Sequence, residues 1–213
     1  MKTLFKIIFL LSLYIPLFGQ TLTVLTPPPV FPSAPGITVI HKTELNWSRR
    51  PLNWNCFRII SDTTVTKTIG TIKINAKAAT TTGITANFQY IGNELYFDVQ
   101  SVFSIKQSWF LKESQGDTAL LRHEQMHFNI TELYARKIRK LLAEYKNPFG
   151  KEKEIRTKID FLKQAERDEN NLYDIESVHS TNKAMQKKWE EKIIKELEET
   201  KKYINPNCKV TYN

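Results

Sequence analysis

The pattern of apolar and polar residues divides the chain into two parts. Between residues 37 and 110 apolar residues tend to alternate with polar ones, as at Leu95, Phe97 and Val99. A period of two is typical of strands that have one buried face. Glycine-containing turn signals separate these runs, at Gly70, Gly83 and Gly92. We therefore expect residues 37–113 to form a mostly antiparallel β-sheet.

The second part has the period of helices. Asp117 or Thr118 can cap a first helix, which the proline and glycine of 147–150 end. Apolar residues spaced three and four apart predict a second helix over about 152–172 and a third over about 181–203. Strands followed by helices indicate an α+β fold, with one long helix and two further helices after the sheet.

The first 20 residues have the features of a signal peptide. Lys2 and Lys6 precede a short apolar run, and the segment closes on Gly19 and Gln20, near which we expect cleavage. The run is too short for a comfortable membrane span. This predicts a secreted or periplasmic bacterial protein without stable membrane insertion after cleavage of the signal.

A proline-rich stretch follows the signal. Its prolines favour an extended, stiff segment, so we interpret residues 21–36 as a spacer. The remainder, 37–213, is long enough for one domain with a substantial core. In that domain 37–113 would be β-rich and 114–213 helical.

The formal charge of +9 does not by itself indicate a polyanionic partner. In the C-terminal third Lys alternates with Glu, and mixed signs at helical spacing are typical of a solvated helix face. A nucleic-acid surface would concentrate one sign, so we expect no nucleic-acid partner.

The chain has two cysteines, Cys56 and Cys208. In an oxidising compartment they could form a disulfide that ties the C-terminal tail to the start of the domain. The alternative is two unpaired thiols.

Residues 123–127 read His-Glu-Gln-Met-His, within the first predicted helix. Residues four apart lie on the same face of a helix, so His123 and His127 can bind one zinc ion. Glu124 stands beside them and can take a proton from a zinc-bound water, which is the chemistry of metal-assisted hydrolysis. We predict Zn²⁺ as the cofactor, with Glu124 as the general base.

A hydrolytic zinc site usually has a third protein ligand. His179 lies where the second helix gives way to the third, in a polar cluster, and we expect it to be that ligand. Asp174 and Glu176 are the alternatives, and either could instead accept the distal ring N–H of a ligating histidine. His41 lies in an alternating stretch, which favours a surface or packing role.

These residues resemble a bacterial family of predicted secreted zinc-dependent proteases, catalogued as domain of unknown function 922. The resemblance covers nearly the whole mature chain and is carried by residues 123–136 and 173–180. The second block is similar to Tyr-Asp-x-x-Thr-x-His-Gly, with Ser177 and Ser180 in place of Thr and Gly. The resemblance implies a zincin-like metallopeptidase. It also implies the roles of four residues, namely His123, His127 and His179 as zinc ligands and Glu124 as the base.

The sequence thus predicts an exported zinc-dependent metallopeptidase acting on a peptide or protein substrate. An exposed edge strand, such as Leu95–Ser101, could align an extended peptide. Tyr134, Arg136 and Tyr173 could stabilise the oxyanion, or they could simply pack. Two other functions stay open, a zinc amidase acting on cell-wall peptides and an exported zinc-binding scaffold without catalysis.

Overall fold

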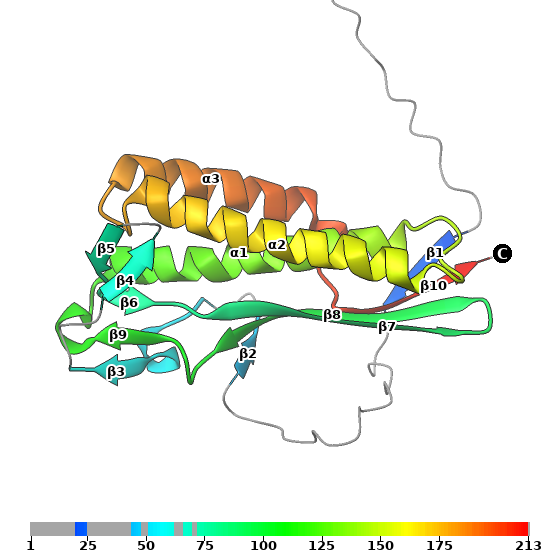
Figure 1. Ribbon diagram of the computed structural model, residues 1–213, viewed down its shortest axis with the longest axis horizontal. Coiled ribbons are helices and arrows are strands. Elements are labelled where there is room, and N and C mark those ends of the chain that lie inside the picture. The colour runs from blue at the N-terminus through cyan, green and yellow to red at the C-terminus, as the bar shows by residue number, and fades with distance from the viewer. Residues whose placement is uncertain (1–19, 25–43, 48–50, 62–65, 70–71, 213) are drawn as a thin grey trace, which may run out of the picture.

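The computed structural model describes residues 20–24, 44–47, 51–61, 66–69 and 72–212, which fold as α+β. The long strands of the main sheet lie on one side of the molecule, and three long helices lie along one face of them (Figure 1). The predicted fold class is therefore confirmed at this level. The predicted signal peptide (1–20) lies outside the described residues except for Gln20.

A long hairpin forms the centre of the main sheet. Strands β7 (Thr82–Ile91) and β8 (Glu94–Ser104) pair antiparallel around Gly92, whose φ of 60° suits glycine. The alternation in β8 has the expected result, because its apolar residues are buried; these include Leu95, Phe97 and Val99. Strand β2 (Glu44–Asn46) also pairs with β8.

The sheet includes two strands that the sequence pattern did not predict. Strand β10 (Asn207–Tyr212) lies between β8 and β1 (Gln20–Val24) and pairs antiparallel with both. Residues 21–24, which we expected to begin the proline-rich spacer, thus belong to the sheet. The rest of that stretch, 25–36, lies outside the described residues.

Shorter strands form two small sheets. In one, β9 (Trp109–Leu111) pairs parallel with β3 (Arg58–Ile60) and antiparallel with β6 (Ala78–Ala79). In the other, β4 (Thr66–Ile69) pairs with β5 (Ile72–Asn75). Short 3-10 helices complete the described elements, at Trp54–Cys56, Lys112–Ser114 and Lys201–Tyr203.

The long helices begin close to where the sequence predicts. Helix α1 (Thr118–Ala143) is capped by the Asp117 carboxylate, which accepts hydrogen bonds from the backbone N–H groups of residues 119 and 120. Helix α2 (Glu152–Ser177) runs five residues beyond its expected end, because buried Tyr173 packs on Trp189 and continues the apolar face. Helix α3 (Lys183–Glu199) is shorter than expected at both ends.

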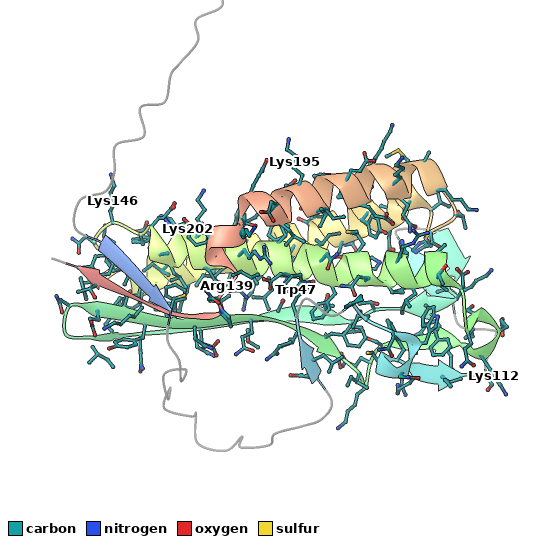
Figure 2. All side chains as sticks on the ribbon, turned by 180° about the vertical axis from the view of Figure 1, so that it is seen from behind. Trp47, Lys112, Arg139, Lys146, Lys195 and Lys202 are labelled. Atoms are coloured by element: carbon teal, nitrogen blue, oxygen red, sulfur yellow. The ribbon has the colours of Figure 1, made fainter. Side chains whose placement is uncertain are left out.

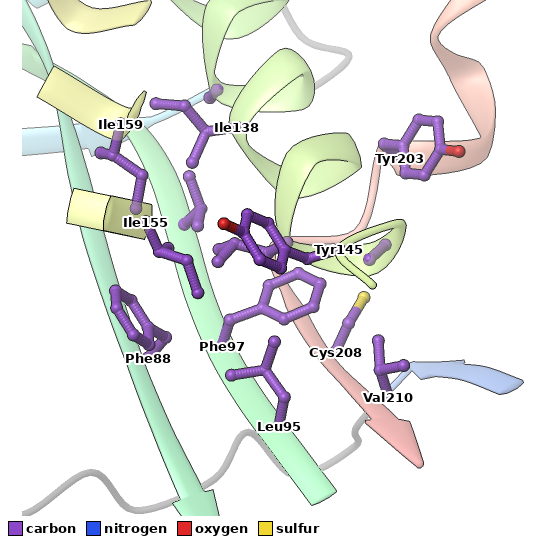
Figure 3. Close-up of a cluster of buried hydrophobic side chains, with 14 residues drawn as sticks. Phe88, Leu95, Phe97, Ile138, Tyr145, Ile155, Ile159, Tyr203, Cys208 and Val210 are labelled. Atoms are coloured by element: carbon purple, nitrogen blue, oxygen red, sulfur yellow. The ribbon is translucent and has the colours of Figure 1, made fainter. Parts of the chain in front are cut away.

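Helix α1 is the central element of the core. Toward the sheet it contributes Ala135, Ile138 and Leu142 to a cluster that includes side chains of β8 and β10 (Figure 3). Toward α2 and α3 it contributes Ile130 and Leu133 to a second cluster. A helix buried on opposite sides is held firmly, so the side chains on it have fixed positions.

The two cysteines are free thiols, which contradicts the expected disulfide. Cys208 is buried in the cluster shown in Figure 3, and burial raises the pKa of its thiol to about 11. Cys56 packs against a different cluster, around Phe103 and Phe110. Each thiol is thus placed by its own apolar neighbours.

Among the helices of the described ranges, none combines the length and the apolar character that crossing a membrane requires.

Candidate metal centre

Helix α1 presents His123 and His127 to the same buried space. Their Nε2 atoms lie 3.3 Å apart, and the two rings meet edge to face. Both residues are buried, with 2 % and 7 % of their surface exposed. The predicted spacing of one helical turn therefore places two imidazole nitrogens side by side.

Asp174 on α2 supplies the atom on which the histidines converge. Its Oδ1 lies 3.1 Å from His123 Nε2, 3.0 Å from His127 Nε2 and 3.2 Å from His179 Nδ1. The structure thus brings the three predicted zinc ligands together. It also places Asp174, which we expected only as an alternative, at the centre of the group.

His179 reaches this group through an unusual turn between α2 and α3. Val178, His179 and Ser180 have φ values of 47°, 48° and 72°, in the left-handed region that non-glycine residues rarely adopt. Backbone hydrogen bonds hold the turn, from His179 N to Asp174 O and from Asn182 N to Ser177 O. Such a conformation costs about 1 kcal/mol or more per residue, and strain of this kind is concentrated at functional sites.

The electrostatics favour an ionised Asp174 carboxylate at the centre of the group. Burial alone would raise the pKa of the Asp174 carboxyl, yet the charge of His127 and hydrogen bonds from the three imidazoles hold it well below its usual range. Burial lowers the pKa of His123, although its hydrogen bond to Asp174 acts in the opposite direction. An ionised carboxylate beside an imidazole that prefers to be neutral is a favourable environment for a cation.

The donor set fits zinc. In a tetrahedral zinc site with bonds of about 2.0–2.1 Å, neighbouring ligand atoms lie about 3.3–3.4 Å apart. The distances between the carboxylate oxygen and the imidazole nitrogens, 3.0–3.2 Å, are close to that value. His123, Asp174 and His179 also form a group whose ligand atoms all lie within 4.8 Å of one another.

Glu124 lines the same site. It is 3 % exposed, and its Oε2 has no hydrogen-bond partner in the described part of the chain. The three histidines, Asp174 and Glu124 together line a cavity of about 420 Å³. A buried carboxylate oxygen without a partner, next to a cavity, is available for a proton or a substrate.

Other residues that we considered for the site lie elsewhere. Glu176, an alternative ligand, accepts a hydrogen bond from Trp189 Nε1 at 2.8 Å. Tyr134 lies in the cluster between α1 and α3, under Lys137, and Arg136 donates to Glu132. For these two residues the packing alternative applies, because both side chains are used in packing or ion pairing and neither lines the cavity.

Tyr173 contacts a ligand but is not part of the cavity wall. Its ring stacks on that of His123, with 4.7 Å between centroids, and the residue is fully buried. Burial raises the pKa of its phenol above the usual range. Tyr173 therefore supports the His123 ring and is not placed to meet an oxyanion. His41, the remaining histidine, lies outside the described residues.

Two further residues on α2 join the site, and no motif in the sequence indicated them. The amide oxygen of Asn170 lies 2.8 Å from His127 Nδ1, and Glu166 lies one turn further along. The signal that could have found them is the spacing of Glu166, Asn170 and Asp174, each four residues from the next. Polar side chains at that spacing share one helix face.

Comparison of the chain with models of known families, with curated proteins and with solved structures found no match.

Proposed function

We propose that this protein is an exported, zinc-dependent hydrolase of peptide bonds, with a zincin-like arrangement. The observation that carries the proposal is the convergence of three imidazole nitrogens on one carboxylate oxygen, beside the unpaired oxygen of Glu124 and a cavity of about 420 Å³. A buried group of this kind stabilises little by itself, whereas a bound metal and its chemistry would account for every member.

The three histidines are the ligands that the proposal assigns to zinc. When bound, zinc supplies Lewis acidity and lowers the pKa of a coordinated water toward neutrality. The chain's own contribution is Glu124, which takes the proton of the attacking water and delivers it to the departing amine nitrogen. The unpaired Oε2 of Glu124 is the atom suited to this transfer.

The substrate would lie along a strand edge, but not along the one that the sequence suggested. Leu95–Ser101 belongs to β8, which is paired on both sides and cannot accept another strand. Strand β6 lies at the edge of its sheet, and its two residues line the cavity. Lys77 O accepts a hydrogen bond from Leu111 N, so the main-chain groups of Ala78 point away from β9 and toward the edge with which no described strand pairs. An extended peptide could pair there.

Asp174 is the reason to keep a second candidate function. A site that used its carboxylate together with all three imidazoles would have four protein ligands and no open position, as structural zinc sites do. The protein would then be an exported zinc-binding scaffold. In the hydrolase, the three imidazole nitrogens that face Asp174 Oδ1 would hold the zinc, and the fourth position would be left to water and not to that oxygen.

The decisive experiment replaces the base and keeps the ligands. Glu124→Gln should bind near-stoichiometric zinc yet lose at least about 10²-fold of its activity on an unfolded protein substrate, because the amide cannot accept the proton. The matched control is Glu113→Gln, at an exposed position before α1, and it should keep full activity. Equal hydrolysis by Glu124→Gln would rule out this mechanism. Zinc binding without hydrolysis by the unaltered protein would favour the scaffold.

A further inference from the structure

The second ring nitrogen of His127 has a specific partner, and this distinguishes His127 from its neighbour. His127 Nδ1 lies 2.8 Å from the side-chain oxygen of Asn170. His123 Nδ1 is also buried but has no hydrogen-bond partner in the described part of the chain. Within the described part of the chain, His127 is therefore the imidazole on α1 whose second ring nitrogen is hydrogen-bonded to a side chain.

The orientation of the Asn170 amide follows from its other contacts. Its nitrogen lies 2.7 Å from Glu166 Oε1 and 3.3 Å from the Glu166 carbonyl oxygen. Both atoms can only accept, so the NH₂ group must face them and the amide oxygen must face His127. An amide oxygen cannot donate. His127 must therefore carry its proton on Nδ1.

Glu166 in turn is fixed by two further elements. Its Oε1 also accepts from the Thr131 hydroxyl on α1, at 2.6 Å, and the residue is only 6 % exposed. Thr131 has a single proton, so in its 2.7 Å contact with Thr82 on β7 the Thr82 hydroxyl is the donor. Because Asn170 Nδ2 also faces the Glu166 carbonyl oxygen, which can only accept, the amide keeps its orientation whether Glu166 is ionised or protonated.

We propose that Glu166 and Asn170 are positioning residues that fix His127 in the tautomer protonated on Nδ1. Nε2 is then the nitrogen that faces Asp174 Oδ1, at 3.0 Å, at the point shared with His123. A cation bound at that point would take Nε2 as its ligand atom, while Nδ1 keeps its proton on the hydrogen bond to Asn170. The role of these residues in zinc binding rests on the proposed function. The tautomer of His127 rests only on the contacts of Asn170 and Glu166.

The tautomer can be read without metal. In the zinc-free full-length protein at pH 8, two-bond ¹H–¹⁵N correlation spectra should show His127 protonated on Nδ1. Asn170→Ala should convert it to a mixture of tautomers. Asn170→Asp keeps an acceptor oxygen and should keep the Nδ1–H form, whereas a merely structural role would not distinguish the two variants in this way. Finding His127 protonated on Nε2 in the unaltered protein would overturn the proposal, whether or not any variant folds.

Zinc affinity is the second measurement, by competition with a chelator. Asn170→Ala should bind zinc about 10- to 100-fold more weakly, the usual effect of losing an outer partner of a ligating histidine. Glu166→Ala should change affinity in the same direction, and Asn171→Ala, at the exposed neighbouring position, should not. An unchanged affinity in folded Asn170→Ala would contradict the proposal. Loss of hydrolysis alone bears only on the proposed function.

Discussion

Helix α1 carries two buried polar clusters, one after the other, and they differ in how completely their hydrogen bonds are satisfied. The first contains His123, Glu124 and His127. The second contains Glu132, Arg136 and Arg139, and it is sealed between the helix and the sheet, where Figure 2 shows Arg139. Both clusters have side chains that are almost never buried without a reason.

In the second cluster, every charged group has partners. Glu132 Oε1 accepts from Arg136 at 2.8 Å and from Arg139 at 2.9 Å, and its Oε2 accepts from Ser101 at 2.7 Å. Arg139 also donates to the carbonyl oxygens of Val99 and Tyr203. These contacts join the helix to β8 and to the segment before β10, which is a structural role.

In the first cluster, by contrast, several buried polar atoms lack hydrogen-bond partners within the ranges that the structure describes. Glu124 Oε2, His123 Nδ1 and His179 Nε2 are buried without partners in the described residues, and a cavity adjoins them. Unsatisfied buried groups are costly and are uncommon in native proteins. The difference between the clusters is therefore not burial of charge, which they share, but the unmade contacts beside a cavity, and these make the first cluster the candidate site.

The largest effect should come from breaking the satisfied cluster. Glu132→Ala leaves two guanidinium groups buried without their counterion, and we expect it to lower the free energy of unfolding by about 3–5 kcal/mol. Urea denaturation would measure the loss, with exposed Glu113→Ala as a control that should stay within about 0.5 kcal/mol. A loss below about 1 kcal/mol for Glu132→Ala would mean that the cluster does not hold α1 to the sheet.

A smaller effect should come from completing the unsatisfied cluster. Free zinc at about 100 times its dissociation constant should raise the free energy of unfolding by about 2.7 kcal/mol, because only the folded chain assembles the site. A chelator should reverse the gain, and His123→Ala should abolish it. Stabilisation that persisted in His123→Ala would place the zinc elsewhere.

The smallest expected effect is a difference in reactivity between the two thiols. They lie near the two halves of α1, so they report on both without a change in the charges of the helix. Cys208 packs near the satisfied cluster, and its pKa of about 11 keeps it almost wholly protonated at pH 8. Cys56 is only partly buried, near the first half of the helix. A thiol reagent should therefore label Cys56 at least about tenfold faster than Cys208 in the folded protein. Mass spectrometry would show two labels after unfolding without reductant, and none if a disulfide were present.

Local features of this structure could be predicted from the sequence, but contacts between distant elements could not. The spacing of His123 and His127 and the cap at Asp117 depend on neighbours within one helix, so their geometry was predictable. The convergence of His179 with them was inferred from a polar cluster at a helix junction. The central position of Asp174 depends on the five extra residues of α2 and on the left-handed turn after that helix. Neither feature could be predicted from a periodic pattern.

The same reason explains the error about the edge strand. Alternation in Leu95–Ser101 identified a strand with one buried face, but one of its neighbours in the sheet, β10, comes from residues more than a hundred positions away. Such pairing depends on the register of the whole sheet. Whether a strand is central or at an edge was therefore not readable from its own residues.

The position of β10 also affects when the core under α1 can form during folding. Residues 207–212 enter between β1 and β8, and Cys208 and Val210 fill part of the core under α1. Pairing of β10 with β8 closes a loop of about a hundred residues, and such long-range pairing is slow. The chain is also synthesised from its N-terminal end, so β10 is made after β8 and α1. A growing chain therefore contains both histidines of α1 well before the strand that finishes the support of that helix. Assembly of the centre would be timed by the last strand to arrive.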